Sequence, residues 1–491
     1  NTALSLSIGM AWAKKIRHEP GWVVAVIGDG AFTGGMVYEG MNNIGSLDNL
    51  LVILNDNKMS ISHNVGALAR YLTHLRTTTA YFDAKENVRS FLDSVPVVGT
   101  PLKKALTEGK TLLRRAMYHS TMFEDMGFQY IGPVDGHNEE ELERTLRTIS
   151  QRPGPHFLHV VTKKGKGYQL AEMNPGNYHG VSAFDPDGMP DPEVAPKESF
   201  STTFGQALAR EAAQNSRICA ITAAMKYGTG LQFFSHSAPE RFFDVGMAEQ
   251  HAVTFAAGLA SRGLKPFFVV YSSFLQRGFD QIIHDIAIGG FSVRLLIDRA
   301  GIVGEDGETH QGLFDVSFLA SVPDMTVYSP CYYSELENDI KRAAKEDRFC
   351  AVRYPRGCEK QEPDLDFSGD FTVINGGKKA IVTYGRLFSD ALEAKAVCKD
   401  ISIVKLNKIY PLSRELTDRL KEFNEIHFFE EGIRSGGIAE LCAARLLEEG
   451  YGGIYKIHAV ENRFVPTATV TGAIKACGLD TESMIAAVSE K

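Results

Sequence analysis

The sequence predicts an α/β protein built on mostly parallel sheets flanked by helices. Short apolar runs rich in β-branched residues alternate with stretches of helical periodicity along the whole chain. Several of these runs end in glycine or in polar residues, as buried parallel strands do where they leave a sheet. At roughly 100–200 residues per domain, the 491 residues leave room for two to four such domains.

The first block begins with an apolar helix pattern that ends near Ile16. Residues 22–27 follow as a buried strand, and residues 50–54 repeat that pattern before the polar stretch Asn55-Asp56-Asn57. Asn138, followed by three glutamates, predicts a helix start, because a polar cap and acidic residues both favour a helix N-terminus. The next strand is expected at 156–161.

Residues 169–198 interrupt this alternation with several prolines, glycines and aspartates, which is the composition of a linker. A second α/β block is expected at 199–370 and a third at 371–491. The strands expected in these two blocks lie at 218–222, 267–271, 293–297 and 380–383.

Composition narrows the function classes. The formal net charge is −8, without the basic excess that a nucleic-acid-binding protein usually shows. The seven cysteines include no CxxC pair, so neither a zinc site nor a disulfide framework is expected. No apolar run approaches the ~20 residues of a membrane helix. We therefore expect a cytoplasmic protein with no nucleic-acid or membrane partner.

The chain begins at Asn1 without methionine and enters a helix pattern at once. We expect from this that the sequence is cut inside its first domain.

A first polar motif, Gly28-Asp29-Gly30-Ala31, follows the first strand, and Asn55-Asp56-Asn57 follows the second. A lone motif of this kind indicates only a tight turn. The two motifs, one βα unit apart, together place carboxylate and amide oxygens near a helix N-terminus. Such oxygens suit Mg²⁺, and the free N–H groups suit a phosphate.

A second motif centres on Glu249, which lies among the apolar residues Val245, Met247, Val253 and Phe255. A surface glutamate that opens a helix is the simpler interpretation. The apolar neighbours favour a buried carboxyl with a shifted pKa. On the next strand end, Tyr271 and Phe274 are either core aromatics or a stacking surface for a ring.

Longer strings carry a family resemblance. The chain resembles the 1-deoxy-D-xylulose-5-phosphate synthase family more than transketolase, from Asn1 to the C-terminus. The strings that carry the resemblance lie at 130–137, 163–168, 248–258, 271–277, 298–304 and 353–357.

The resemblance implies three transketolase-like α/β domains. These are a diphosphate-binding domain at 1–168, the linker 169–198, a pyrimidine-binding domain at 199–370 and a C-terminal domain at 371–491. The last is expected to serve packing and dimer contacts. A homodimer would use thiamine diphosphate and Mg²⁺ to decarboxylate pyruvate and transfer two carbons to D-glyceraldehyde 3-phosphate. The product would feed isoprenoid, thiamine and pyridoxal precursor synthesis.

The resemblance also implies residue roles. The metal would be held by Asp29, Asn57 and the Met59 carbonyl. The cofactor would contact Asp29, Gly30, Ala31, Asn57, Tyr168, Glu249 and Phe274. Glu249 would hydrogen-bond the aminopyrimidine ring and promote the tautomer that removes the thiazolium proton. The catalytic set would be Glu249, His310, Lys164 and His179. Substrate would be bound by Tyr271, Arg277, Arg299, Asp306, His310 and Arg353. Arg299 and Arg353 would pair with the phosphate, because a guanidinium matches phosphate oxygens bidentately.

Two alternatives stay open at this point. A transketolase or a 2-oxo acid dehydrogenase component would share the metal motif and Glu249. A non-catalytic remnant is the other, because the family has a segment before Asn1 with histidines that face the cofactor. We expect on that ground that the chain alone binds cofactor weakly and turns over little pyruvate.

Overall fold

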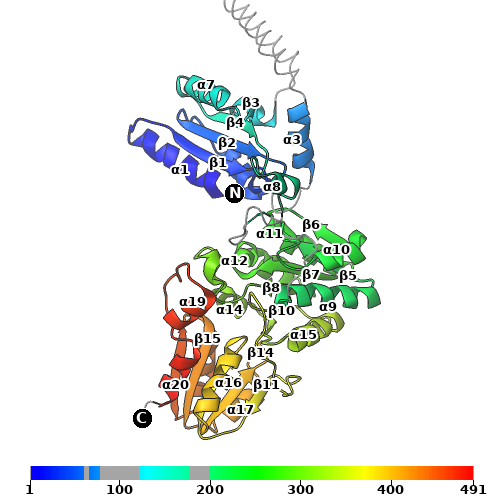
Figure 1. The fold of residues 1–491 in the computed structure, drawn as a ribbon, viewed down its shortest axis with the longest axis vertical. Coiled ribbons are helices and arrows are strands. Elements are labelled where there is room, and N and C mark those ends of the chain that lie inside the picture. Colours follow the sequence, from blue (N-terminus) through cyan, green and yellow to red (C-terminus); the bar gives the residue numbers. More distant parts are fainter. Residues whose placement is uncertain (1, 60–65, 78–120, 177, 180–197, 490–491) are drawn as a thin grey trace, which may run out of the picture. The chain divides into compact units, whose positions relative to one another are not determined.

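The computed structural model describes residues 2–59, 66–77, 121–176, 178–179 and 198–489. The chain divides into two compact units, one of residues 1–190 with 246–248, and one of 191–245 with 249–491 (Figure 1). Every helix among the described residues is too short or too polar to span a bilayer.

The first unit contains a four-stranded parallel sheet in the order β1-β2-β4-β3. Its strands are β1 (Val23–Gly28), β2 (Leu50–Asp56), β3 (Gln129–Asp135) and β4 (His156–Val161). Its helices are α1 (Thr2–Ile16), α2 (Gly35–Asn42), α3 (Ala67–Thr77), α6 (Met122–Asp125), α7 (Glu139–Ser150) and α8 (Gln169–Met173). Because all four strands are parallel, the residues that follow them gather at one edge of the sheet.

Strand β1 differs from the prediction in one respect. It forms where expected, but it is buried on one face only, since Val24 is 50% and Val26 is 63% exposed. The predicted helix start at Asn138 is confirmed, because its side chain accepts the N–H of Glu141 at the beginning of α7.

The second unit contains a seven-stranded sheet in the order β14-β9-β10-β8-β7-β5-β6. Its strands are β5 (Ile218–Thr222), β6 (Phe242–Asp244), β7 (Lys265–Tyr271), β8 (Arg294–Asp298), β9 (Thr326–Tyr328), β10 (Cys350–Arg353) and β14 (Lys408–Tyr410). Only β14 among them pairs antiparallel. The helices that carry site residues or pack nearby are α9 (Phe200–Gln214), α11 (Glu249–Ser261), α12 (Ser272–Leu275), α14 (Asp315–Leu319) and α15 (Tyr333–Lys345).

A five-stranded sheet completes the second unit, in the order β11-β13-β12-β15-β16. Its strands are β11 (Phe371–Ile374), β12 (Lys379–Tyr384), β13 (Ile401–Leu406), β15 (Glu425–Ile433) and β16 (Ile454–Val460), and its helices include α16 (Leu387–Val397), α17 (Arg414–Leu420), α18 (Ile438–Glu448), α19 (Val470–Ala476) and α20 (Thr481–Ser489). The strands predicted in this unit and those at 50–54 and 156–161 are all observed, within two residues at each end. The predicted α/β class is therefore confirmed.

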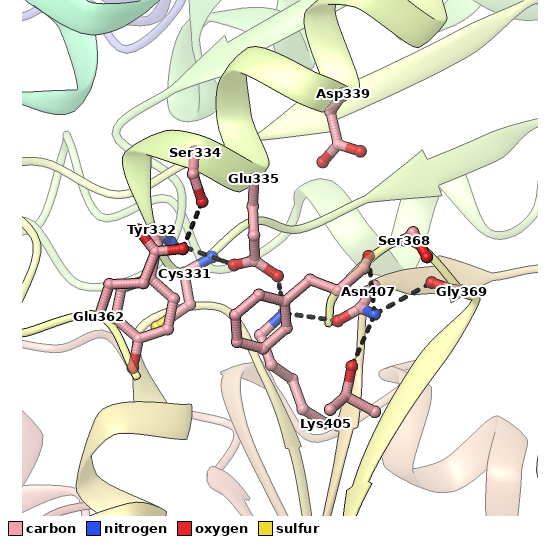
Figure 2. Close-up of polar contacts among 12 residues, drawn as sticks. Cys331, Tyr332, Ser334, Glu335, Asp339, Glu362, Ser368, Gly369, Lys405 and Asn407 are labelled. Atoms are coloured by element: carbon pink, nitrogen blue, oxygen red, sulfur yellow. Dashed lines mark hydrogen bonds and ion pairs between the residues drawn. The ribbon is translucent and has the colours of Figure 1, made fainter. Parts of the chain in front are cut away.

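A buried ion pair joins strand β13 to helix α15 in the second unit (Figure 2). Lys405 of β13 lies 2.5 Å from Glu335 of α15 and donates to Asn407 Oδ1 at 2.7 Å. The other carboxylate oxygen of Glu335 accepts the N–H groups of Cys331 and Tyr332 at 2.6 and 3.1 Å. Because both carboxylate oxygens of Glu335 are paired, these contacts offset the desolvation penalty of burying the two charges.

Candidate functional site

A first group of candidate site residues lies at the carboxyl edge of the four-stranded sheet. Asp29 follows β1 and Asp56 ends β2, and the two side chains are 2% and 1% exposed. Burial, and then the charge of Asp56, raises the pKa of Asp29 to about 7. Among the described residues, the Oδ2 atom of Asp29 is buried without a hydrogen-bond partner. An orphaned carboxylate oxygen beside a second buried carboxylate is a place for a cation.

Two backbone-to-side-chain hydrogen bonds fix this edge. The Gly30 N–H donates to Asp29 Oδ1 at 3.0 Å, and the Met59 N–H donates to Asn57 Oδ1 at 3.0 Å. Asp29, Asn57 and the Met59 backbone thus belong to two adjacent strand ends, as predicted from the motif pair. The described residues contain no group of three His, Cys, Asp or Glu side chains able to hold a metal by themselves. The available oxygens therefore fit a hard cation that takes carbonyl and phosphate ligands as well.

No role was predicted from the sequence for the residues that contact Asp56, which are His159 and, through it, Tyr130. His159 of β4 lies with Nε2 2.9 Å from Asp56 Oδ2, and its Nδ1 lies 2.8 Å from the hydroxyl of Tyr130. This buried chain orients Asp56 against Asp29. The one available signal was a histidine inside an otherwise apolar strand, which is not enough to assign a partner 103 residues away.

Lys164 and His179 form a pair in the same unit. The Lys164 Nζ lies 2.8 Å from His179 Nδ1. Burial lowers the pKa of Lys164, and the charge of Asp29 opposes that shift, so the ammonium lies within electrostatic reach of the carboxylate edge. Burial and the neighbouring Lys164 lower the pKa of His179. The rings of Tyr168 and Tyr178 meet edge to face at 5.5 Å on the adjoining segment.

A second group of candidate site residues lies at the carboxyl edge of the seven-stranded sheet. The parallel strands β6, β7, β8 and β10 bring Glu249, Tyr271, Arg299 and the segment 353–356 to this edge. The sequence placed these residues on strand ends, and the topology brings those ends together.

Glu249 begins α11 and is 4% exposed. It forms an ion pair with Arg277, whose side chain is 34% exposed. Burial raises the pKa of Glu249, and the Arg277 charge opposes that rise. The buried interpretation of this carboxyl is therefore the correct one.

Three rings contact one another at this edge of the sheet. Tyr271 stacks on Phe274 at 5.4 Å between ring centres, and His310 meets Phe274 edge-on at 5.3 Å. The Arg299 guanidinium lies 4.0 Å above the Tyr271 ring.

Arg299 is held by its neighbours and keeps one donor unused. Its Nη1 donates to the Gly228 carbonyl at 3.0 Å and to Asp298 Oδ1 at 2.9 Å. Within the described part of the chain, its Nε is buried without a hydrogen-bond partner. A buried, unpaired guanidinium N–H is suited to an anionic ligand.

The structure gives the guanidinium of Arg353 a protein partner in the place of the phosphate expected for it. Arg353 is 3% exposed, and its guanidinium donates to both oxygens of Asp315, at 2.9 and 3.2 Å. The bidentate face that a phosphate needs is already occupied. Arg356, three residues later, pairs with Asp306 at 3.2 Å, and both side chains are about one-third exposed, at 33% and 32%. Sequence reasoning missed Arg356, although the same short motif contains it.

These residues lie within electrostatic reach of one another. Burial raises the pKa of Tyr271, and the charges of Arg299, Asp298, Asp306 and Arg356 all act on it. Arg299 and Arg356 thus place positive charge near Tyr271, and such charge can attract an anionic ligand.

The fold and the two polar edges define an enzyme of the transketolase type, a class that generally depends on thiamine diphosphate. Two solved structures support the fold. A transketolase from Campylobacter jejuni is 14% identical, with a TM-score of 0.50, and the match covers 99% of this chain and 81% of that one. A protein titled "Split gene transketolase, inactive beta4 tetramer" is 26% identical, with a TM-score of 0.53, over 59% of this chain and 97% of that one.

Sequence comparisons give the particular family. Residues 1–162 match the family described as 1-deoxy-D-xylulose-5-phosphate synthase, and residues 197–359 match the transketolase pyrimidine-binding domain. The 1-deoxy-D-xylulose-5-phosphate synthase of Clostridium perfringens strain SM101 is 43% identical over 496 residues, which cover 99% of this chain and 80% of the relative. That of Caldanaerobacter subterraneus subsp. tengcongensis is 41% identical over 498 residues, with coverage of 99% and 79%. The chain belongs to the 1-deoxy-D-xylulose-5-phosphate synthase family, and the predicted transferase class and synthase activity are confirmed.

Proposed function

We propose that Asp29, Asn57 and the Met59 carbonyl hold a Mg²⁺ ion that also binds the cofactor diphosphate. The buried, unpaired oxygen of Asp29 is the observation that carries this proposal. A cation there would offset the repulsion between Asp29 and Asp56 that now raises the Asp29 pKa. Gly30 and Ala31, at the turn that follows Asp29, would offer N–H groups to the diphosphate.

When bound, thiamine diphosphate supplies the electron sink for decarboxylation of pyruvate and for transfer of the remaining two carbons. Burial raises the pKa of Glu249, which would help this carboxyl to share a proton with the aminopyrimidine ring. Phe274, stacked on Tyr271, and Tyr168 offer aromatic surface to the cofactor.

D-glyceraldehyde 3-phosphate is the acceptor in this proposal. Arg299 and Arg356 hold its phosphate, with the Tyr271 hydroxyl between them. Arg353, which is paired with Asp315, stabilises the end of β10. His310 and Asp306 lie on the loop after Arg299 and face the acceptor. Arg277, paired with Glu249, faces pyruvate.

Lys164 and His179 exchange a proton with the reacting groups. Their 2.8 Å contact would let a proton pass between the two nitrogens, and burial lowers the pKa of both groups.

We propose the domain boundaries that the sequence predicts. The three domains are residues 1–168, 199–370 and 371–491, and the linker is residues 169–198. We further propose that the enzyme is a homodimer that works in the cytoplasm. The seven cysteines are all unpaired, which suits a reducing compartment.

Titration calorimetry with thiamine diphosphate, with and without Mg²⁺, tests the metal assignment. The Asp29→Asn variant should lose the Mg²⁺-dependent part of the binding. Asp135→Asn removes an exposed carboxylate from the same edge of the sheet and should bind as the wild type does. If Asp29→Asn kept the full Mg²⁺ dependence, the metal would lie elsewhere.

A further inference from the structure

We propose that Glu431 and Arg386, both in the 371–491 segment, are positioning residues for the loop 299–312. The loop carries Arg299, Asp306 and His310, so the inference rests on the acceptor site proposed above.

The contacts converge on one residue of the loop, Ile302. Glu431 Oε1 accepts the Ile302 N–H at 2.6 Å, and Arg386 donates to the Ile302 carbonyl. Arg386 Nε also donates to both oxygens of Glu431, at 3.0 and 2.9 Å. Ile302 is fully buried and Glu431 is 4% exposed. A charge-assisted pair thus satisfies the N–H and the C=O of the same loop residue, away from water.

The loop backbone is shaped to receive this carboxylate. Gly301 has φ +81°, and a Cβ at that position would lie 2.4 Å from Glu431 Cδ. Only glycine combines that conformation with so close an approach. Gly301 and Gly312 exchange two backbone hydrogen bonds of 2.7 Å, which close the loop on itself. Fixing residue 302 therefore fixes both ends of the closed segment.

The tip of the loop rests on the same segment of the chain. Gly304 packs against the backbone of residues 468–470, and a Cβ there would lie 2.7 Å from the Val470 nitrogen. Gln311 accepts the Val303 N–H at 2.8 Å and donates to the Val465 carbonyl at 3.4 Å. Asp306 and His310 project from a loop whose position is set by the five-stranded sheet and its flanking segments. The effect of the pair should therefore appear in acceptor binding.

Glu430 provides a matched control. It precedes Glu431 in β15 and is equally buried, at 0% exposed. It accepts the Tyr384 hydroxyl at 3.0 Å and the Ile438 and Ala439 N–H groups at 2.9 and 3.3 Å, so it holds α18 and not the loop.

The experiment compares Glu431→Gln, Arg386→Lys and Glu430→Gln in the enzyme with cofactor bound. A glutamine at 431 can accept from Ile302 only by turning its amide donor toward Arg386. We expect Glu431→Gln and Arg386→Lys to raise the KM for glyceraldehyde 3-phosphate about tenfold, the effect of losing one charge-assisted hydrogen bond. The KM for pyruvate should change by less than about twofold. Glu430→Gln should lower the melting temperature and leave the ratio of the two KM values unchanged.

Hydrogen exchange at the Ile302 amide gives a readout that does not depend on turnover. It should accelerate in Glu431→Gln and not in Glu430→Gln. Unchanged exchange in Glu431→Gln, or an equal rise of both KM values, would overturn the positioning role. If the wild type did not use glyceraldehyde 3-phosphate, the proposed acceptor site would fail, and the exchange measurement alone would decide whether the pair holds the loop.

Discussion

The guanidinium of Arg353 donates two hydrogen bonds to the carboxylate of Asp315, at 2.9 and 3.2 Å, and neither side chain reaches solvent appreciably. This pair ties the end of β10 to α14. Removing one partner would leave the other charge buried and unpaired, which typically costs about 3–5 kcal/mol. Arg353 therefore stabilises the end of β10 at the site.

Arg356→Ala and Arg299→Ala should raise the KM for glyceraldehyde 3-phosphate far more than that for pyruvate, because only the former carries a phosphate. Each lost charge-assisted hydrogen bond should cost about 1.5–3 kcal/mol, or roughly 10- to 150-fold. Steady-state kinetics with each substrate varied in turn measures the split.

Arg353→Ala is the control for this prediction. It should lower the free energy of unfolding, measured by urea titration, without that selective change in KM. A rise in the KM for glyceraldehyde 3-phosphate alone in Arg353→Ala would contradict the structural role of Arg353. An equal rise of both KM values in Arg356→Ala would contradict the phosphate role of Arg356.

Glu249→Gln should leave the fold intact and slow the loss of the thiazolium C2 proton. A positioned acid or base typically contributes about 10²–10⁴-fold. Exchange of that proton for deuterium, followed by NMR in quenched samples without substrate, isolates this step from substrate binding. An unchanged exchange rate would transfer the role to another residue.

Asp339 gives a pH-dependent prediction about stability. It is 8% exposed, and burial raises its pKa to about 7, although Arg342 lies 3.6 Å away. A carboxyl whose pKa is higher in the folded than in the unfolded state binds its proton more tightly when folded. Its contribution to stability is therefore present at low pH and is lost as the pH rises toward 7.

Asp339→Asn removes this titration. The unfolding free energy of the variant minus that of the wild type should increase by up to about 1.4 kcal/mol per pH unit between pH 5 and 7. Urea unfolding at three pH values measures the trend. A difference that does not change with pH would mean that Asp339 is ionised throughout this range.

The sequence predicted most strands because a strand buried in a parallel sheet must be apolar along its length. The run at 156–161 is such a case, and its bounds agree with β4. The same pattern does not tell whether both faces are covered, which is why the exposure of Val24 and Val26 was missed.

The residues of the candidate site could also be predicted from the sequence only in part. Asp29 and Glu249 could be assigned because their neighbours in the sequence form motifs. Arg353 and Arg356 lie in one short motif, and nothing local separates them. Only the pairing of β10 with β8 and the approach of α14 place Asp315 beside Arg353. Contacts between residues distant in the sequence, such as Asp56 with His159, leave no local signal.

The central claim is that pyruvate is the donor and glyceraldehyde 3-phosphate the acceptor of this enzyme. The most direct measurement is the release of CO₂ from labelled pyruvate by the enzyme, with thiamine diphosphate and Mg²⁺ present. We expect slow release from pyruvate alone, a marked increase on adding glyceraldehyde 3-phosphate, and one 1-deoxy-D-xylulose 5-phosphate formed for each CO₂. Asp29→Asn should abolish both. Release that glyceraldehyde 3-phosphate does not change, or turnover of a ketose phosphate in place of pyruvate, would contradict the account.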